Sequence, residues 1–138
     1  MLADRGGDFL CNVDSDVLVK PNWLKTILST YLNACDDLST SDVVISVFNK
    51  KNHPIKEEFS SFFVKKSLSG VNLFFPTKMF YTHVQKALLE KNQWDWALVR
   101  LMNDDNLPLI CTKPSVVQHI GFVGMNSKKH GFDVADDF

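Results

Sequence analysis

Two aspartates separated by one residue, Asp14 and Asp16, follow a short apolar run at residues 9–13. An apolar run that ends abruptly in polar residues is typical of a buried strand that delivers side chains at its C-terminal tip. Carboxylates at such a tip can hold a hard divalent cation, because Mg²⁺ or Mn²⁺ commonly binds through one or two carboxylates together with substrate phosphates. The segment Asp14-Ser15-Asp16 is also a good turn former, since its side chains can bond their own backbone. The motif alone does not distinguish a metal site from a simple turn.

A third acidic residue, Asp95, stands in the first turn of an expected helix that begins at Trp94. The apolar residues of that helix recur on one face, and Asp95 lies off this face, so its carboxylate is free to face a cleft. A first-turn carboxylate also stabilises a helix through the macrodipole, by ~0.3–1 kcal/mol. Of the flanking tryptophans, Trp94 fits the core better, whereas Trp96 lies on another side of the helix and could stack on a sugar.

Strands and helices are expected in alternation along the chain. Apolar runs predict strands at residues 9–13, 43–48, 59–64, 71–75 and 109–111. Helical spacing predicts helices from Pro21 to about Cys35, from about Phe80 to Lys91, and from Trp94 to about Met102. Residues 49–58 are polar and read as a loop. This order indicates an α/β layer architecture.

Composition narrows the class of protein. The chain has 138 residues, of which 45% are hydrophobic and 22% charged, and its net charge is −1. Such values fit one globular domain and give no electrostatic footprint for nucleic acid. No apolar stretch approaches the ~20 residues that cross a bilayer, so no integral membrane segment is expected. Three widely spaced cysteines suggest a reducing compartment, so we expect a cytoplasmic protein, or one peripheral at the inner membrane face.

Three ordered motifs carry a resemblance to a known family. Residues 9–24 resemble the segment of GT-A glycosyltransferases, close to family two, in which an apolar strand ends in a D-x-D motif before a proline and a Trp-Leu helix start. Residues 69–76 are similar to the strand before the acceptor-side helix, and Trp94-Asp95-Trp96 resembles the later acidic motif. Residues 113–121 resemble the P-S-x-x-x-H-x-G stretch that closes the domain in many bacterial transferases.

This resemblance implies a partial GT-A fold, Rossmann-like, with a mixed sheet flanked by helices. It implies a metal-dependent enzyme that moves a sugar from a nucleotide-sugar donor to a hydroxyl of a saccharide acceptor, on a glycan or a lipid-linked molecule. Asp16, with Asp14 and Ser15, would bind Mn²⁺ or Mg²⁺ and the donor, and Asp95 would be the catalytic base of an inverting reaction. Substrate contacts would come from Asn72, Trp94 and Trp96.

His119 has two possible roles. A lone histidine after an apolar run is most often a hydrogen-bonded core residue. In some retaining relatives a late histidine is a further ligand to the cation, so the resemblance also makes His119 a metal or phosphate ligand.

The chain also departs from the family pattern. Only thirteen residues precede Asp14, whereas the family has a nucleotide-binding βαβ half there. We therefore expect residues 1–124 to be the metal- and acceptor-side part of a transferase domain, followed by a mobile tail at residues 125–138. The alternatives are a non-catalytic truncated fragment or a carbohydrate-binding module. A sheet without its early strands would expose an edge and an apolar face, so a homo-oligomer or pairing with a missing N-terminal half is expected.

Overall fold

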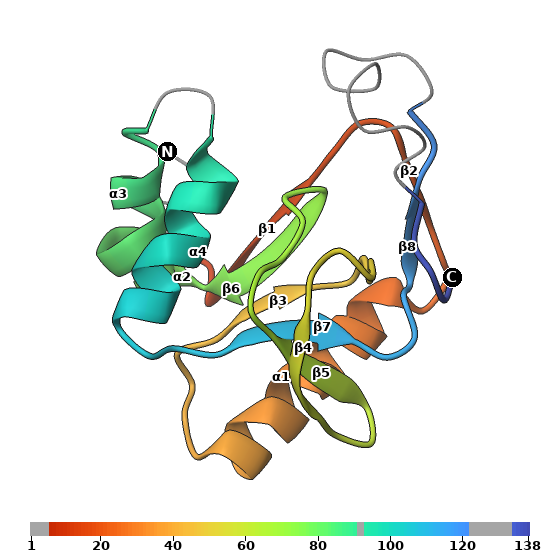
Figure 1. The fold of residues 1–138 in the computed structure, drawn as a ribbon, viewed down its shortest axis with the longest axis horizontal. Coiled ribbons are helices and arrows are strands. Elements are labelled where there is room, and N and C mark those ends of the chain that lie inside the picture. The colour runs from red at the N-terminus through yellow and green to blue at the C-terminus, as the bar shows by residue number, and fades with distance from the viewer. Residues whose placement is uncertain (1–5, 91–92, 122–133) are drawn as a thin grey trace.

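The computed structural model describes residues 6–90, 93–121 and 134–138, which form a mixed α/β arrangement around a six-stranded sheet (Figure 1). The strand order is β1-β6-β3-β7-β5-β4. The bounds are Phe9–Val13 (β1), Asn72–Pro76 (β6), Val44–Ser46 (β3), Leu109–Thr112 (β7), Phe62–Lys65 (β5) and Ile55–Glu58 (β4). Strands β3 and β7 are parallel, and the other neighbouring pairs of this sheet are antiparallel. The sheet is therefore mixed, as expected.

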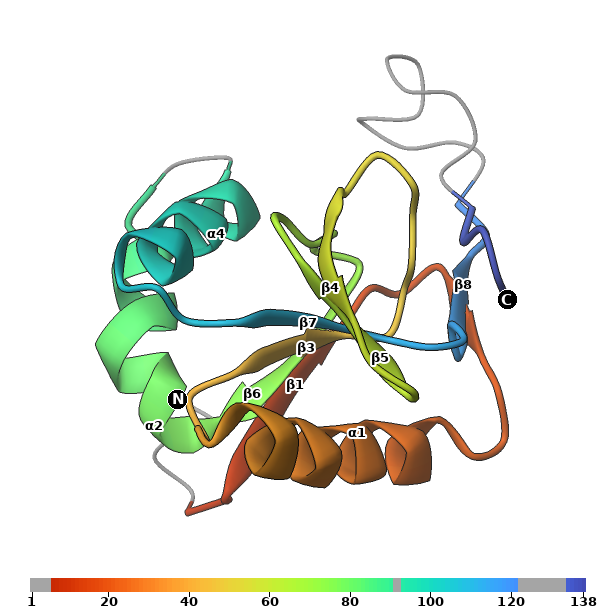
Figure 2. The same cartoon turned by 60° about the horizontal axis from the view of Figure 1, so that its bottom comes forward.

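Helices cover both faces of the sheet (Figure 2). Helix α1 (Trp23–Leu38) packs on one face, where Ile45, Phe74 and Ile110 are buried against it. The opposite face carries α4 (Trp94–Asp104) and a helical stretch made of α2 (Thr77–Met79), the π-helical segment η2 (Phe80–Val84) and α3 (Gln85–Ala87). Because neighbouring side chains of a strand point to opposite faces, the continuous apolar runs of β3, β6 and β7 supply both cores.

A short two-stranded ribbon stands apart from the main sheet. Strand β2 (Val17–Val19) pairs antiparallel with β8 (Val117–His119), with Val17 opposite His119. The connection is tied to the main body, because the backbone N–H of Val116 donates to the carbonyl of Val47 at 3.1 Å. This ribbon brings the segment after the D-x-D motif beside the late histidine.

The expected elements are largely present, with two corrections. The prediction of a loop at residues 49–58 is wrong at its end, because Ile55–Glu58 forms edge strand β4, whose side chains are all exposed. An exposed edge strand lacks the apolar alternation on which strand prediction depends. The three-residue strands β2 and β8 were not predicted either.

The last five residues lie against the body of the protein. The backbone N–H of Asp136 donates to the carbonyl of Asn49 at 2.9 Å, and that of Ala135 to Gln118 Oε1 at 2.7 Å. Residues 134–138 are thus hydrogen-bonded where a mobile tail was expected, and the expected tail at residues 125–133 lies outside the described residues.

Two surface features complete the fold. Within the described residues, β1 pairs with β6 on one side and has no strand on its other side. Helix α1 exposes Leu24, Leu28 and Leu32, at 49%, 38% and 61% of their surface, so half of its predicted apolar face has no cover there. None of the described helices has the length and hydropathy that a membrane crossing needs.

Candidate functional site

The first part of the site is the end of β1, where the chain leaves the sheet. The backbone N–H of Asp14 donates to the carbonyl of Val71 at 3.0 Å, so the end of β1 is fixed against the start of β6. Asn12 strengthens this junction, because its Oδ1 accepts from the backbone N–H of Leu73 at 2.9 Å and its Nδ2 donates to the carbonyl of Gly70 at 3.0 Å. Asp14 is therefore held at a defined position.

Asp16 and His119 meet at the ribbon. The backbone N–H of Ile120 donates to the carbonyl of Asp16 at 2.8 Å, next to the β2–β8 pairing. This register places Nε2 of His119 3.3 Å from Oδ2 of Asp16. The side chain of His119 is 18% exposed and that of Asp16 is 46% exposed. The pair therefore lies at the surface, and Asp16 is its more accessible member. The structure thus joins the D-x-D motif to the late histidine.

Gly121 lies directly behind this pair. A Cβ atom added to Gly121 would be 2.0 Å from Asp16 Oδ2 and 3.0 Å from Cε1 of His119. No side chain fits there unless the carboxylate moves, because real Cβ atoms do not come within 3.0 Å of another heavy atom. The glycine therefore lets the backbone approach the Asp16 carboxylate.

Asp95 is positioned in the same manner by a second glycine. A Cβ atom on Gly70 would be 3.0 Å from both Cβ and Oδ2 of Asp95, so the aspartate side chain rests on the glycine backbone. Oδ1 of Asp95 accepts the backbone N–H of Trp96 at 2.9 Å. Within the described residues Oδ2 has no hydrogen-bond donor, so it is available to accept a proton.

Electrostatics link these groups to Asp14. The pKa of the Asp14 carboxyl is raised, chiefly because partial burial disfavours its charged form. Electrostatic interaction with Asp16 raises this pKa further, interaction with His119 opposes the rise, and Asp95 adds to it. Asp14, Asp16, Asp95 and His119 therefore form one interacting group, called here the Asp/His cluster.

The protein side chains of the cluster do not by themselves complete a metal site. Among the described residues there is no set of three acidic, histidine or cysteine side chains close enough to hold a metal ion. Two adjacent octahedral ligands of Mg²⁺ are about 3 Å apart, since each bond is about 2.1 Å. The 3.3 Å between Asp16 Oδ2 and His119 Nε2 is close to this value. Two protein donors would leave the remaining positions to water and phosphate oxygens, which Mg²⁺ usually retains.

The other predicted residues have different surroundings. Asn72 is fully buried, its Nδ2 donates to the carbonyl of Asn12 at 3.1 Å, and its Oδ1 has no hydrogen-bond partner in the part of the chain that the structure describes. Its amide therefore joins β6 to β1 and does not reach solvent. Trp94 packs against the core, as its helical position indicated, whereas Trp96 is 49% exposed beside Asp95. Ser15 lies exposed in the turn between Asp14 and Asp16.

Sequence reasoning missed a cavity formed by other residues. The cavity has a volume of about 660 Å³, and its lining includes His53, Lys65, Lys113 and the C-terminal Asp136 and Asp137. Its residues come from β4, β5, the loop before β4, the segment after β7 and the chain end, so no local pattern could have grouped them. A buried lysine at the end of β5 has no sequence signal, because burial there depends on distant segments.

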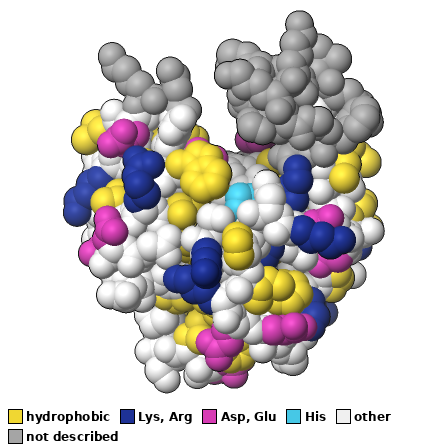
Figure 3. Space-filling model, viewed as in Figure 1, with side chains coloured by type: hydrophobic (Ala, Val, Ile, Leu, Met, Phe, Trp, Pro, Cys, Tyr) yellow, Lys and Arg dark blue, Asp and Glu magenta, His cyan; other side chains and the backbone are white. Residues whose placement is uncertain are grey.

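Charges of both signs share the face shown in Figure 3, where basic side chains lie near acidic ones and a histidine is visible close to the centre. This distribution does not form the extended basic area that a nucleic-acid backbone requires.

No protein-family model matches the chain, and a search of curated proteins found no match either.

Proposed function

We propose that this chain carries the metal- and acceptor-side part of a glycosyltransferase, which transfers a sugar from a nucleoside-diphosphate donor to a hydroxyl of a saccharide. The observation that carries the proposal is the 3.3 Å approach of Asp16 and His119, with Asp14 and Asp95 in the same cluster. Three motifs that are far apart in sequence contribute to this cluster, as a common site would require. The alternative is a binding module, in which the cluster holds a ligand without reaction.

Asp16 and His119 would hold Mn²⁺ or Mg²⁺ together with the donor diphosphate. The cation would neutralise the charge that develops on the departing nucleoside diphosphate. Asp14, fixed by its backbone bond to Val71, would contribute a second carboxylate to the cation or accept a ribose hydroxyl. Burial is the main cause that raises the pKa of Asp14, and the nearby carboxylates of Asp16 and Asp95 add to it, so a cation at this position would be favoured.

Asp95 would act as the base. Its Oδ1 is engaged by the Trp96 N–H and its Cβ rests against Gly70, so the side chain has a fixed orientation. Oδ2 would accept the proton of the attacking acceptor hydroxyl as the new glycosidic bond forms on the face opposite the leaving group. This geometry corresponds to inversion of the anomeric carbon. The exposed Trp96 would stack on the acceptor sugar next to that hydroxyl.

A kinetic experiment tests this assignment. Release of nucleoside diphosphate from UDP- and GDP-sugars is measured with Mn²⁺ and a panel of saccharide acceptors, for the wild type and for Asp95→Asn. A general base contributes about 10²–10⁴-fold, so kcat should fall by that factor while donor affinity is kept. Asp104→Asn, at the other end of α4, is the matched control and should retain full activity. Equal rates for wild type and Asp95→Asn would overturn the base assignment, and donor binding without any turnover would favour the binding module.

A further inference from the structure

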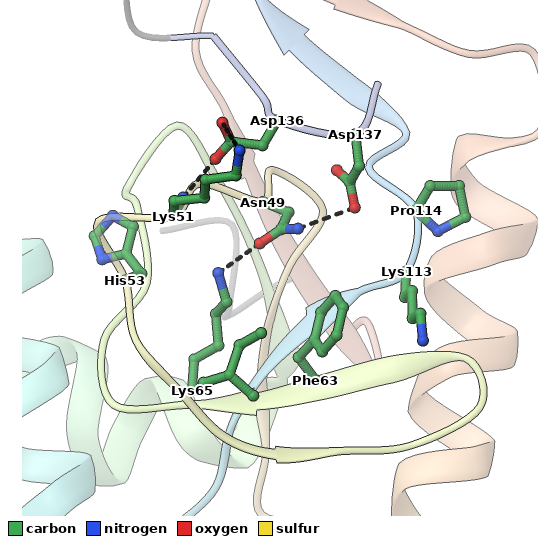
Figure 4. Close-up of a pocket in the computed structure, with 10 residues that line it drawn as sticks. Asn49, Lys51, His53, Phe63, Lys65, Lys113, Pro114, Asp136 and Asp137 are labelled. Atoms are coloured by element: carbon green, nitrogen blue, oxygen red, sulfur yellow. Dashed lines mark hydrogen bonds and ion pairs between the residues drawn. The ribbon is translucent and has the colours of Figure 1, made fainter.

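The cavity of about 660 Å³ contains a buried ammonium group without a direct counter-ion. Lys65 is only 2% exposed, yet it lines the cavity. Its Nζ donates to Asn49 Oδ1 at 2.5 Å (Figure 4). It also donates to the carbonyl of Lys50 at 2.9 Å, so both acceptors are neutral oxygens. An ammonium has three donors, and the third has no acceptor within the described residues. A buried ammonium without a counter-ion is costly, so binding of an anion would be favourable.

The carboxylates of the cavity are already engaged elsewhere. Asp137 accepts from Ser115, through both its backbone N–H at 3.1 Å and its hydroxyl, and from Asn49 Nδ2 at 2.9 Å. The amide of Asn49 therefore stands between Asp137 and Lys65. Asp136 accepts the backbone N–H of Lys51 at 2.5 Å, and Lys51 Nζ lies 3.9 Å from its other oxygen. Neither carboxylate forms an ion pair with Lys65.

The size of the cavity suits a small molecule, and the hydrogen bonds of Lys65 suit an anionic one. Lys113 is paired with Glu58 outside the lining, so the remaining lining balances Lys51 and Lys65 against Asp136 and Asp137. The need for an anion therefore comes from the position of Lys65, whose Nζ contacts only neutral oxygens among the described residues. A volume of about 660 Å³ is within the usual range of small-molecule sites. Burial lowers the pKa of the Lys65 ammonium, and an anion at its free donor would reverse this change.

One wall of the cavity leads to the proposed acceptor side. His53 lines the cavity, and its ring centroid lies 6.2 Å from that of Trp96. Trp96 follows the proposed base, Asp95, directly in the helix. The imidazole is itself held by Ser67, with 2.8 Å between Nδ1 and Oγ. A saccharide stacked on Trp96 could therefore extend past His53 into the cavity.

From these contacts we infer that the cavity binds an acidic saccharide acceptor, whose carboxylate or phosphate group is held by Lys65. This inference deepens the proposed function. Only the role of the bound saccharide as the acceptor depends on that function. The binding step itself requires neither donor nor cation. The same anion could come from a free carboxylate or phosphate ion, and the experiment separates these sources.

Binding is measured by ¹H–¹⁵N NMR titration of the isolated chain, without metal or nucleotide, using glucuronate, glucose 6-phosphate, neutral methyl glucoside, acetate and inorganic phosphate. An acidic sugar should bind and shift the amide signals of Asn49, His53 and Lys65. Methyl glucoside should bind at least about tenfold more weakly, because a charge-assisted hydrogen bond is lost. Acetate or phosphate alone binding as tightly as the acidic sugars would overturn the saccharide assignment, and so would no binding of either sugar acid.

Lys65→Met removes the charge with little change in volume and should weaken binding of the acidic sugar by about tenfold or more. Lys66→Met is the matched control, because this neighbouring lysine is exposed and lies outside the cavity lining. Equal affinity in Lys65→Met and the wild type would refute the inference. If Lys65→Met does not fold, the wild-type shift map decides, since shifts at Asp16 and His119 in place of Asn49 and Lys65 would also refute it. Loss of sugar transfer in a separate assay would leave this binding result unchanged, so the two failures are distinguishable.

Discussion

Nε2 of His119 lies 3.3 Å from Oδ2 of Asp16, although the two residues belong to opposite ends of the chain. The β2–β8 ribbon creates this contact, because Val17 and His119 are direct partners in its register. A ribbon of two three-residue strands outside the main sheet gains little stability from its own pairing. A role in holding the two side chains together would explain its presence.

Gly121→Ala should displace the Asp16 carboxylate without replacing any charged residue. The added methyl would overlap Asp16 Oδ2, 2.0 Å away, and force the carboxylate out of its position. Displacement of a ligand of this kind typically costs about 10–100-fold in metal affinity. Mn²⁺ affinity is measured by calorimetry, with circular dichroism to confirm the fold.

The matched control for this variant is Gly7→Ala, whose new Cβ would be an ordinary 3.5 Å from the Phe9 carbonyl oxygen. Unchanged Mn²⁺ affinity in Gly121→Ala would show that Asp16 does not hold the cation in this position.

Asp14→Asn should stabilise the protein at neutral pH. The folded state raises the pKa of Asp14, so the charged carboxylate opposes folding at every pH above that raised pKa. As the pH falls through the raised pKa towards the unfolded value of about 3.8, the wild type takes up the proton and this penalty disappears. The stability gain of the variant should therefore be largest at neutral pH and vanish near pH 3, as followed by thermal unfolding. A gain of equal size at both pH values would contradict the account.

Asn12→Ala should destabilise the fold by about 1–3 kcal/mol, because it leaves the N–H of Leu73 and the carbonyl of Gly70 without their side-chain partner. Unfolding in urea measures the change. Asn22→Ala is the control, since Asn22 precedes α1 but makes no capping hydrogen bond, and its cost should stay below about 0.5 kcal/mol. Equal costs for both variants would mean that Asn12 does not fix the end of β1.

Much of the fold follows from local patterns in the sequence. The apolar runs predict β3, β6 and β7, because these strands are buried against helices on both faces. The run at residues 9–13 also forms a strand, β1, but at the edge of the sheet and not buried as expected, with Cys11 and Val13 exposed. Helix α1 continues past the expected end at Cys35 to Leu38, which packs into the core, and it stops at Ser39, whose φ of 52° is left-handed. Because Asp36 and Asp37 are polar, the apolar spacing did not predict this last helical turn.

The site was predictable only in part. The sequence singled out Asp14, Asp16, Asp95 and His119. The structure brings Asp16 and His119 into contact and leaves Asp14 and Asp95 within electrostatic reach, but the catalytic and ligand roles of all four stay predictions. The contacts of Gly70 and Gly121 with the carboxylates depend on segments that meet only in the folded protein. The spacing of residues along the sequence does not predict such contacts. The same holds for Lys65, whose burial comes from the chain end and the loop at Asn49. Such features require coordinates.

Association is expected through the uncovered side of the molecule. The outer edge of β1 and the exposed Leu32 of α1 offer backbone donors and apolar surface to another chain. Light scattering over a range of concentrations should show self-association that Leu32→Glu reduces. Leu89→Glu changes a leucine that is 82% exposed just beyond α3 and should leave association as it was. A clean monomer of the wild type at every concentration would contradict this expectation.

The central claim is tested most directly by calorimetric titration of the chain with UDP and GDP, with and without Mn²⁺, repeated on Asp16→Ala and on the control Asp36→Ala. The account predicts nucleotide binding that requires Mn²⁺, is abolished in Asp16→Ala and is retained in Asp36→Ala. Absence of Mn²⁺-dependent binding by the folded wild type, or equal binding by Asp16→Ala, would contradict it.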